Sequence, residues 1–233
     1  MYKSSFSFVI PAFNEEGNIK KIIDAAYDYL NSNFNSFEII IVNDGSSDNT
    51  GKICKELGLK YGKNLIAINH DANLGYGAAL RTGLFSAKNE LVFYTDADCQ
   101  FDITEISNFM NFINDYDLVI GFRLDRKDNF IRKLCAFVYN RMVFILFGLD
   151  VKDIDCSFKL FKREALGKLS IDRNQFLVDT ELLVKARLNN LAIKQLGVKH
   201  FPRFAGKSTV KPKHIFITLK DLNFLYWKLK KGK

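Results

Sequence analysis

Short runs of β-branched and aromatic residues alternate with amphipathic segments in the first half of the chain, and this alternation constrains the fold more than any other feature. It is typical of βαβ units, in which helices pack against a largely parallel sheet. Helical spacing of apolar residues predicts a helix at 19–30, and further helices are expected at 48–61 and 75–87. Strands are expected at 6–10, 37–42, 65–68, 91–95 and 118–120. We therefore expect an α/β fold with a mostly parallel central sheet flanked by helices.

The chain is long enough to bury one substantial hydrophobic core. It has 233 residues, of which 48% are apolar, and this length is short for two full domains. We expect one domain over 1–211, followed by an amphipathic basic helix over 212–233. No stretch reaches the roughly 18 to 20 uninterrupted apolar residues that a membrane span needs. We therefore expect no transmembrane segment.

Cysteine spacing and the N-terminal residues indicate a reducing compartment. The four cysteines lie far apart and form no CxxC pair or Cys/His cluster, which argues against a disulfide framework and against structural zinc. Residues 1–13 have one lysine and a very short apolar run before a proline, so they lack the apolar region of a signal peptide. We expect the protein to stay in the cytosol.

The net charge of +8 favours an anionic partner. Nucleic acid, acidic lipid and phosphorylated substrates are all candidates, and composition does not choose among them. Lysines crowd the last third of the chain, which makes a surface of anionic lipid a candidate partner for 212–233. A solvated basic tail without a partner is the alternative.

Three polar loops directly follow apolar strands, at the place where α/β sheets bind ligands. They cover 11–15, 43–48 and 96–100. In the last loop Asp96 and Asp98 flank one alanine, so two carboxylates emerge at one strand end. Such oxygen ligands suit Mg²⁺ or Mn²⁺ when substrate phosphates complete the coordination. For an isolated pair, an acidic turn that caps the next helix is the alternative.

The other two loops carry carboxylates in comparable places. Asp44 ends its strand, where it can accept hydrogen bonds from a base or a ribose, whereas Ser47 or Asp48 is suited to capping the next helix. Glu15 holds the equivalent place after the first strand, with Pro11 restricting the backbone before it. Both loops are therefore candidates for a nucleotide site.

Seven short motifs follow one another along the chain. They span 11–15, 42–50, 73–83, 96–98, 121–123, 153–161 and 201–208. Together the first four resemble the inverting family-2 glycosyltransferases of GT-A fold. The last three resemble the branch of dolichol-phosphate mannose synthases and bacterial polyprenyl-phosphate glycosyltransferases. Each motif is weak alone, but the ordered set is specific.

The resemblance implies a donor half in the earlier motifs and an acceptor half in the later ones. Donor-binding residues would be Pro11, Ala12, Asn14, Glu15, Asp44, Asp96 and Gln100. The metal, Mg²⁺ or Mn²⁺, would be held by Asp96, Asp98 and Gln100, and the catalytic residues would be Asp98, Arg123, Arg132 and Asp155. The acceptor phosphate would contact Arg132, Arg203, Ser208 and Lys211. Lys159, Lys207 and Thr209 depart from the pattern of many mannose synthases, so the identity of the sugar stays open.

The activity implied by the resemblance is metal-dependent inverting transfer of a sugar from a UDP- or GDP-linked donor to a polyprenyl phosphate. A lipid phosphate is already largely dianionic at neutral pH, so it needs no strong general base. The alternative is transfer to a saccharide hydroxyl, for which Asp155 or Glu181 would have to take a proton. We expect no nucleic-acid partner, because nucleic-acid binding leaves the acidic 96–98 loop without a purpose. A dinucleotide dehydrogenase is disfavoured because no GxGxxG motif follows the first strand.

Two segments are candidates for contact with a membrane. The segment 129–147 is aromatic and aliphatic around most of its circumference, with a buried crossover helix as the alternative. The helix at 212–233 carries an apolar stripe flanked by lysines, with a helix docked on the domain as the alternative. We expect a peripheral protein at the cytoplasmic face of a membrane, and a homo-oligomer or a small membrane partner stays open.

Overall fold

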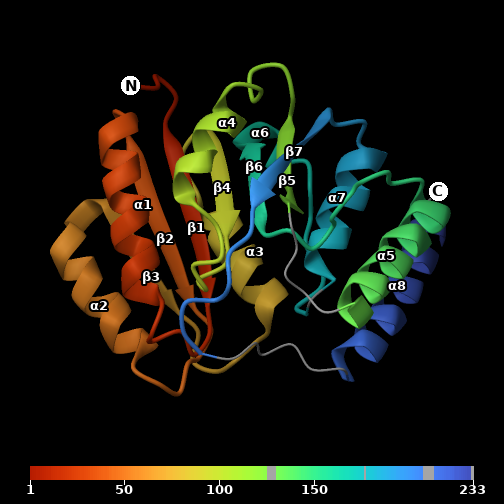
Figure 1. Cartoon of the computed structure of the whole chain (residues 1–233), viewed down its shortest axis with the longest axis horizontal. Helices are drawn as coiled ribbons and strands as arrows, with labels where there is room; N and C mark the ends of the chain where they lie inside the picture. The colour runs from red at the N-terminus through yellow and green to blue at the C-terminus, as the bar shows by residue number, and fades with distance from the viewer. Residues whose placement is uncertain (125–129, 176, 207–212, 232–233) are drawn as a thin grey trace.

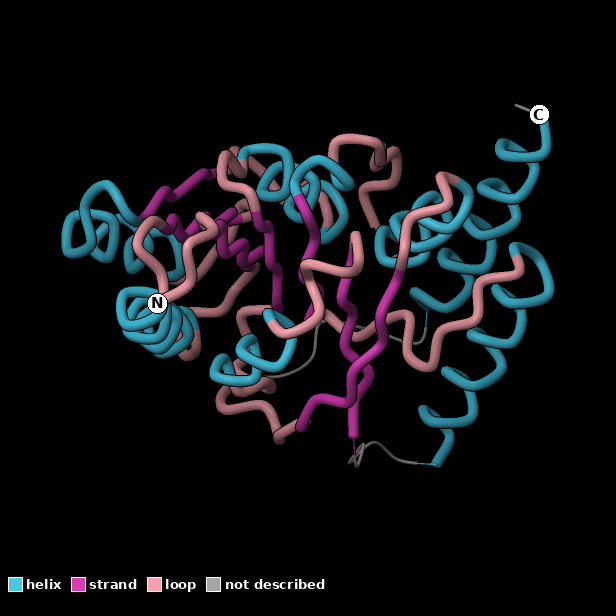
Figure 2. The backbone as a smooth tube through the Cα atoms, turned by 90° about the horizontal axis from the view of Figure 1, so that it is seen from above, coloured by secondary structure: helices cyan, strands magenta, loops and turns pink. Residues whose placement is uncertain are grey.

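The computed structural model describes residues 1–124, 130–175, 177–206 and 213–231, which form a seven-stranded sheet with helices on both faces (Figures 1 and 2). The strands are β1 (Phe6–Ala12), β2 (Phe37–Asn43), β3 (Leu65–Asn69), β4 (Leu91–Thr95), β5 (Leu118–Leu124), β6 (Phe158–Lys162) and β7 (Ile193–Lys199). The α-helices are α1 (Ile19–Asn33), α2 (Thr50–Tyr61), α3 (Tyr76–Ser86), α4 (Ile106–Met110), α5 (Phe130–Phe147), α6 (Arg163–Leu166), α7 (Val178–Leu188) and α8 (Lys213–Lys231). Two 3₁₀ turns, η1 (Gly62–Asn64) and η2 (Ile103–Glu105), complete the elements.

The sheet is mostly parallel, as the sequence predicts. Its strand order is β3-β2-β1-β4-β6-β5-β7, and β1 to β4 run parallel to one another, as do β5 and β7. The exception is β6, which pairs antiparallel with both β4 and β5. The five expected strands are confirmed, whereas β6 was not predicted. Consequently the ends of β1, β2, β4 and β5, and the start of β6, meet at one edge of the sheet.

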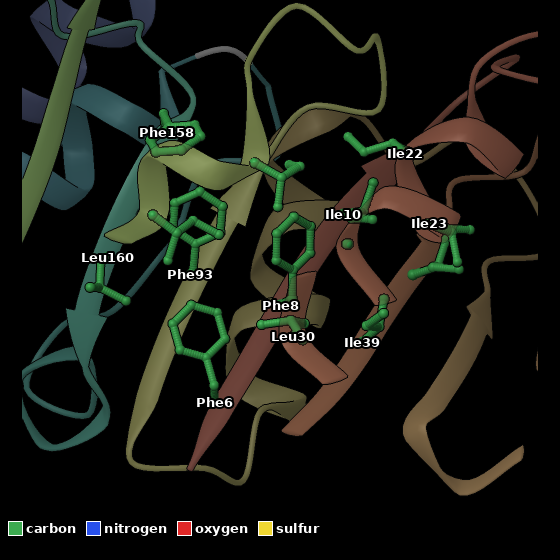
Figure 3. Close-up of a cluster of buried hydrophobic side chains, with 14 of the residues drawn as sticks. Phe6, Phe8, Ile10, Ile22, Ile23, Leu30, Ile39, Phe93, Phe158 and Leu160 are labelled. Carbon is green, nitrogen blue, oxygen red and sulfur yellow. The ribbon is translucent and has the colours of Figure 1, made fainter. Parts of the chain in front are cut away.

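Alternate side chains of each central strand enter two separate cores, because successive residues of a strand point to opposite faces. Phe6, Phe8 and Ile10 of β1 pack against α1, as Figure 3 shows, in a core that also includes residues of α4. Val9 packs with α3 and α7 on the other face. Burying a side chain such as Phe8 stabilises the fold by about 1.5 to 3 kcal/mol. Helices therefore cover both faces of the sheet, and the edge formed by the carboxyl ends of its parallel strands is the part open to ligands.

Small residues let α3 approach the sheet closely. A Cβ at Gly83 would lie 2.4 Å from Cγ1 of Val9, which is far inside van der Waals contact. Because α3 begins directly after the loop that follows β3, this close packing fixes the position of that loop at the sheet edge.

Helices α5 and α8 lie side by side at one end of the molecule (Figures 1 and 2), with the rings of Phe147 and Tyr226 5.9 Å apart. Leu222 and Leu225 of α8 are buried in the core shared with α7. The apolar stripe of α8 is therefore at least partly docked on the domain, the alternative that the sequence left open. Among the described residues, no helix combines the length and apolar character needed to cross a bilayer.

Candidate active site

A cavity of ≈ 1020 Å³ opens at the carboxyl ends of the parallel strands. Ten of the residues predicted for the site line it: Pro11, Ala12, Glu15, Asp44, Asp96, Asp98, Gln100, Arg123, Asp155 and Arg203. Asn14 does not line the cavity, because its side-chain oxygen accepts a 2.8 Å hydrogen bond from the backbone of Ser47 and joins two loops. The side chain of Arg132 lies outside the described residues, as do Ser208 and Lys211.

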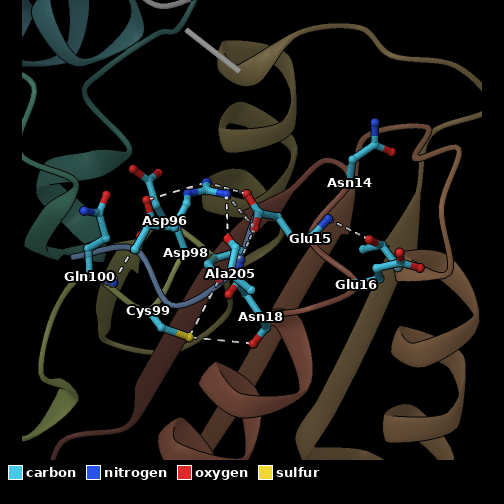
Figure 4. Close-up of polar contacts among 12 residues, drawn as sticks. Asn14, Glu15, Glu16, Asn18, Asp96, Asp98, Cys99, Gln100 and Ala205 are labelled. Carbon is cyan, nitrogen blue, oxygen red and sulfur yellow. Dashed lines mark hydrogen bonds and ion pairs between the residues drawn. The ribbon is translucent and has the colours of Figure 1, made fainter. Parts of the chain in front are cut away.

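The acidic loop after β4 places two carboxylates in the cavity wall (Figure 4). Asp96 Oδ2 accepts a 2.6 Å hydrogen bond from Ser157, while its Oδ1 is buried and has no hydrogen-bond partner among the described residues. Asp98 Oδ1 accepts a 3.2 Å hydrogen bond from the backbone of Gln100. Burial, and then the charge of Asp96, raise the pKa of Asp98 to about 7. The pair therefore has unsatisfied negative character that a cation would relieve.

This loop fits a divalent cation that takes part of its coordination from substrate. No group of three or more His, Cys, Asp or Glu side chains suited to a metal occurs in the described part of the chain, so a closed protein cage is absent there. Mg²⁺ is commonly held by one or two carboxylates, waters and substrate phosphates. The unpartnered oxygen of Asp96 and the acidic character of Asp98 supply such a partial set. Gln100 could contribute only its amide oxygen, because its Nε2 donates a 2.9 Å hydrogen bond to the backbone of Phe201.

The segment 200–206, here called the strap, lies across the ends of β1 and β4. Its Arg203 forms a two-fold ion pair with Glu15, with Nη2–Oε1 at 2.7 Å and Nη1–Oε2 at 3.2 Å. The same Nη2 lies 3.7 Å from Oδ2 of Asp98. The backbone of Ala205 accepts a 3.0 Å hydrogen bond from Asn18 at the start of α1. The strap thus brings one arginine to the two carboxylates that carry the predicted donor and metal roles.

Asp44 lies in the cavity wall with its oxygens already engaged. Oδ1 accepts hydrogen bonds from the backbone of Leu74 at 3.0 Å and faces Nδ1 of His70 at 2.7 Å, while Oδ2 accepts from Gly75 at 2.9 Å. The other ring nitrogen of His70 lies 3.0 Å from the hydroxyl of Thr82. Asp44 therefore shapes the 73–75 loop, and a base or ribose would have to share its oxygens with this network.

The loop 153–157, between α5 and β6, reaches the cavity at several points. Asp153 holds Arg123 in a bidentate pair, with Nε–Oδ2 and Nη2–Oδ1 both at 2.7 Å, so this arginine is anchored in the wall. Asp155 faces the cavity. Although its side chain is exposed to that space, the surrounding protein removes part of its solvation and so raises its pKa. The negative charges of Asp179 and Asp153 add to this effect, and the pKa of Asp155 reaches about 6. Ser157 donates to Asp96, as described above.

Sequence reasoning missed several residues of the site. Ser157, Tyr76 and Asp179 line the cavity, but none was singled out as a candidate. Ser157 lies within the 153–161 motif, which was the signal available for it. Asp179 lies in the first turn of a helix, where an acidic residue commonly serves the helix dipole, so its position alone did not mark it.

The part of the cavity wall that α5 and α8 supply is largely apolar. It is formed by Leu134, Val138 and Met142 of α5 together with Leu219 of α8. The outer surface of α5 is apolar as well, with Phe137 68% and Ile145 70% exposed. One continuous cavity therefore joins the acidic loop and Arg203 to an apolar wall between two helices.

Several curated proteins that resemble this chain are named as transferases for dolichyl or undecaprenyl phosphate. The dolichyl-phosphate beta-glucosyltransferase ALG5D of Trichomonas vaginalis is 32% identical over 213 residues, which cover 83% of this chain and 64% of that protein. The dolichyl-phosphate beta-glucosyltransferase of Homo sapiens is 29% identical, covering 82% and 66%. The undecaprenyl-phosphate 4-deoxy-4-formamido-L-arabinose transferase of Aeromonas hydrophila is 28% identical, covering 93% and 66%. This chain therefore spans about two thirds of the length of these relatives.

Solved structures share the fold. Glucosyl-3-phosphoglycerate synthase from Mycobacterium tuberculosis in complex with UDP has a TM-score of 0.71 at 19% identity, covering 97% of this chain and 79% of that one. The same enzyme in complex with Mn²⁺, UDP and glucosyl-3-phosphoglycerate has a TM-score of 0.68 at 18% identity, covering 96% and 76%. This likeness confirms the GT-A-like α/β fold.

The family model for glycosyl transferase family 2 matches residues 7–170, which is more than half of the chain and includes the acidic loop, Asp44 and the 153–157 loop. The chain therefore belongs to glycosyl transferase family 2.

Proposed function

We propose that this protein transfers a sugar from a nucleotide diphosphate sugar to a polyprenyl phosphate, with Mg²⁺ or Mn²⁺, at the cytoplasmic face of a membrane. The observation that carries the proposal is the cavity that joins an acidic and arginine-bearing end to an apolar end. Such a shape suits an acceptor with an anionic head and a hydrocarbon tail. Relatives that are named for transfer to dolichyl or undecaprenyl phosphate support this choice of acceptor.

The donor half would be built by the loops after β1, β2 and β4. Solved neighbours hold UDP with Mn²⁺ or Mg²⁺, so a uridine diphosphate sugar is the donor to test before a GDP sugar. Asp96 and Asp98 would hold the cation, which stabilises the charge that develops on the leaving diphosphate. Pro11, Ala12 and Glu15 would form the wall against the nucleoside. In this assignment 1–211 is the catalytic domain and 212–233 is an accessory helix.

The acceptor phosphate would approach from the strap. Arg203 lies at the junction of Glu15 and Asp98, where a guanidinium fork can take a phosphate in two places. A lipid phosphate carries its second negative charge above a pKa near 6, so it attacks without giving up a proton. The chain would then need to orient the nucleophile against the anomeric carbon and exclude water, without acting as a base.

Helices α5 and α8 would place the cavity at a bilayer surface. Phe137 and Ile145 of α5, and Phe224 and Trp227 of α8, are each more than half exposed. Trp227 lies beneath a lysine, with Nζ of Lys230 5.3 Å from its ring centroid. Aromatic side chains with adjacent lysines are typical of proteins that bind at the interface of anionic membranes.

In the direct test, the protein is incubated with UDP- and GDP-sugars, Mg²⁺ or Mn²⁺ and a short polyprenyl phosphate. The masses of the lipid products are then measured by mass spectrometry. A parallel reaction contains the matching polyprenol, which lacks the phosphate. Transfer of sugar to the polyprenyl phosphate, and none to the polyprenol, supports the proposal. Equal use of the polyprenol would overturn it.

A second candidate function is transfer to a saccharide hydroxyl. It is favoured by Asp155, which faces the cavity and whose raised pKa of about 6 suits a general base. The donor half would be the same in both reactions. Product analysis with saccharide acceptors in the same panel distinguishes the two.

A further inference from the structure

Lys159 of β6 is buried with no exposed surface, beneath the wall of the cavity. Its ammonium donates to the backbone oxygens of Ile154 at 3.0 Å and Cys156 at 2.5 Å, and to Oδ1 of Asp179 at 2.5 Å. An ammonium has three donors, so all of them are used. A buried charge is tolerated when it is paired and fully hydrogen-bonded, and this one meets both conditions.

Two of these three contacts hold the backbone of the 153–157 loop. That loop supplies Asp153 to Arg123, Ser157 to Asp96, and Asp155 to the cavity. A lysine that binds the carbonyl on either side of Asp155 therefore determines where that carboxylate lies. The loop has no regular secondary structure of its own, so such anchors carry its position.

The third contact connects the lysine to the acidic loop by a second route. Asp179 of α7 also accepts a hydrogen bond from the hydroxyl of Tyr94, through the same Oδ1 atom. Tyr94 belongs to β4, two positions before Asp96. Burial, and then the charge of Asp179, keep the pKa of Tyr94 well above its ordinary value, so its hydroxyl stays a donor. Lys159 is thus joined to Asp96 both through Ser157 and through Tyr94.

We propose that Lys159 is a positioning residue for sugar transfer, which holds the 153–157 loop and Asp179 in register with the Asp96–Asp98 loop. The inference rests on the proposed function for its kinetic readout, but the positioning itself can be measured without substrate. A displaced loop would misplace groups that face the reacting atoms, and misplacement of about 1 Å can cost a hundredfold in rate. The nucleoside wall at Pro11 and Ala12 belongs to β1, whereas the hydrogen bonds of Lys159 go to the 153–157 loop and to α7.

Lys185 provides a matched control within the same chain. It is a second, nearly buried lysine whose ammonium contacts Ser170, Asp172 and Glu181. None of its three partners lines the cavity. Lys159→Met and Lys185→Met therefore remove the same charge and comparable hydrogen bonds, and only the first touches the loop of the site.

The experiment compares these two variants with wild type in three measurements. The first two measure turnover, as the rate of sugar transfer to polyprenyl phosphate and the rate of metal-dependent hydrolysis of the UDP-sugar. The third measures hydrogen exchange at the backbone amides of 153–157. For Lys159→Met we expect kcat to fall about ten- to a hundredfold, with donor KM within about threefold, and exchange at 153–157 to accelerate. Lys185→Met should lower the melting temperature without accelerating exchange at 153–157, because its contacts go to Ser170, Asp172 and Glu181 and none goes to that loop.

Two conservative variants keep the test decisive where Lys159→Met does not fold. Lys159→Arg retains the charge and several donors, so it should recover part of the lost kcat. Tyr94→Phe removes one hydrogen bond to Asp179 and should lower kcat by roughly three- to tenfold. The effect should be smaller than that of Lys159→Met, because Asp179 keeps its ion pair with Lys159. Unchanged exchange at 153–157 in the Lys159 variants would overturn the positioning role, whatever the acceptor is. If exchange at 153–157 accelerates in the Lys159 variants as expected, but wild type transfers no sugar to polyprenyl phosphate, the result counts against the proposed function and not against the positioning role.

Discussion

Arg203 and Glu15 form a bidentate ion pair across the cavity, with the closer contact, Nη2 to Oε1, at 2.7 Å. The sequence assigned the arginine to the acceptor phosphate and the glutamate to the donor, and the structure brings these two groups into direct contact. A phosphate that binds Arg203 must share the guanidinium with Glu15 or displace Glu15 from it, because the phosphate and the carboxylate are both anions. Arg203 therefore lies between the proposed donor half and the proposed acceptor half of the site.

Replacing Arg203 with alanine should weaken acceptor use more than donor use. Each lost charge-assisted contact costs on the order of 1.5 to 3 kcal/mol, roughly ten- to a hundredfold in affinity. We expect KM for polyprenyl phosphate to rise by that factor in steady-state assays, while the affinity for UDP measured by calorimetry changes less than about threefold. Arg163→Ala, an exposed arginine outside the cavity, is the control. An unchanged acceptor KM would exclude Arg203 from the phosphate site.

Asp98→Ala should abolish transfer, and Asp98→Asn should nearly do so, because a neutral side chain cannot hold the cation against the diphosphate. EDTA should have the same effect on wild type, with recovery on adding Mn²⁺ or Mg²⁺. The control is Asp102→Asn, which changes a nearby exposed carboxylate that caps η2. Full activity of wild type in EDTA would show that transfer does not depend on a divalent cation.

The charge change at Asp98 also predicts the stability of the variants. Its pKa is raised to about 7 in the folded protein, so ionisation opposes folding as pH rises through that range when no cation is bound. Asp98→Asn should therefore be at least as stable as metal-free wild type at pH 8, measured by thermal unfolding. A large loss of stability would mean that inactivity of this variant reflects misfolding.

Asp155→Asn separates the two candidate acceptors through the pH profile. Asp155 is ionised above its raised pKa of about 6, and a lipid phosphate gains its second charge in the same range, so wild type should lose activity below about pH 6 in either case. If the acceptor is a phosphate, the acidic fall belongs to the substrate and persists in the variant, with kcat lowered less than about tenfold. If Asp155 is the base for a hydroxyl, kcat drops at least a hundredfold and the fall near pH 6 disappears.

Phe224→Ser with Trp227→Ser should weaken binding to anionic liposomes without lowering stability, since the two side chains are 55% and 51% exposed. Leu59→Ser on α2 is the control, as that leucine is 81% exposed and lies on a different helix. Cosedimentation with vesicles containing anionic lipid measures the effect. Deleting α8 is a poorer test, because Leu222 and Leu225 are part of the core and their loss would destabilise the domain. Equal vesicle binding by the double variant would exclude this face of α8 as the membrane contact.

The sequence alone predicted which residues at strand ends would lie together. Apolar runs that end in polar loops are local patterns, and parallel strands necessarily bring their carboxyl ends to one edge. Asp96, Asp98, Asp44 and Glu15 therefore line one cavity, as their positions at strand ends indicated.

Only the tertiary structure decided the partners of these residues. β6 was missed because its run, FKLFK, places lysine where a solvent-facing residue is expected, yet Lys159 is buried. Its burial depends on acceptors from the 153–157 loop and from Asp179, twenty positions further along the chain. The pairing of Arg203 with Glu15, 188 positions apart, is likewise invisible in any local pattern. Periodicity reports which face of an element is apolar, whereas a buried charge is stable only when distant segments converge to pair it.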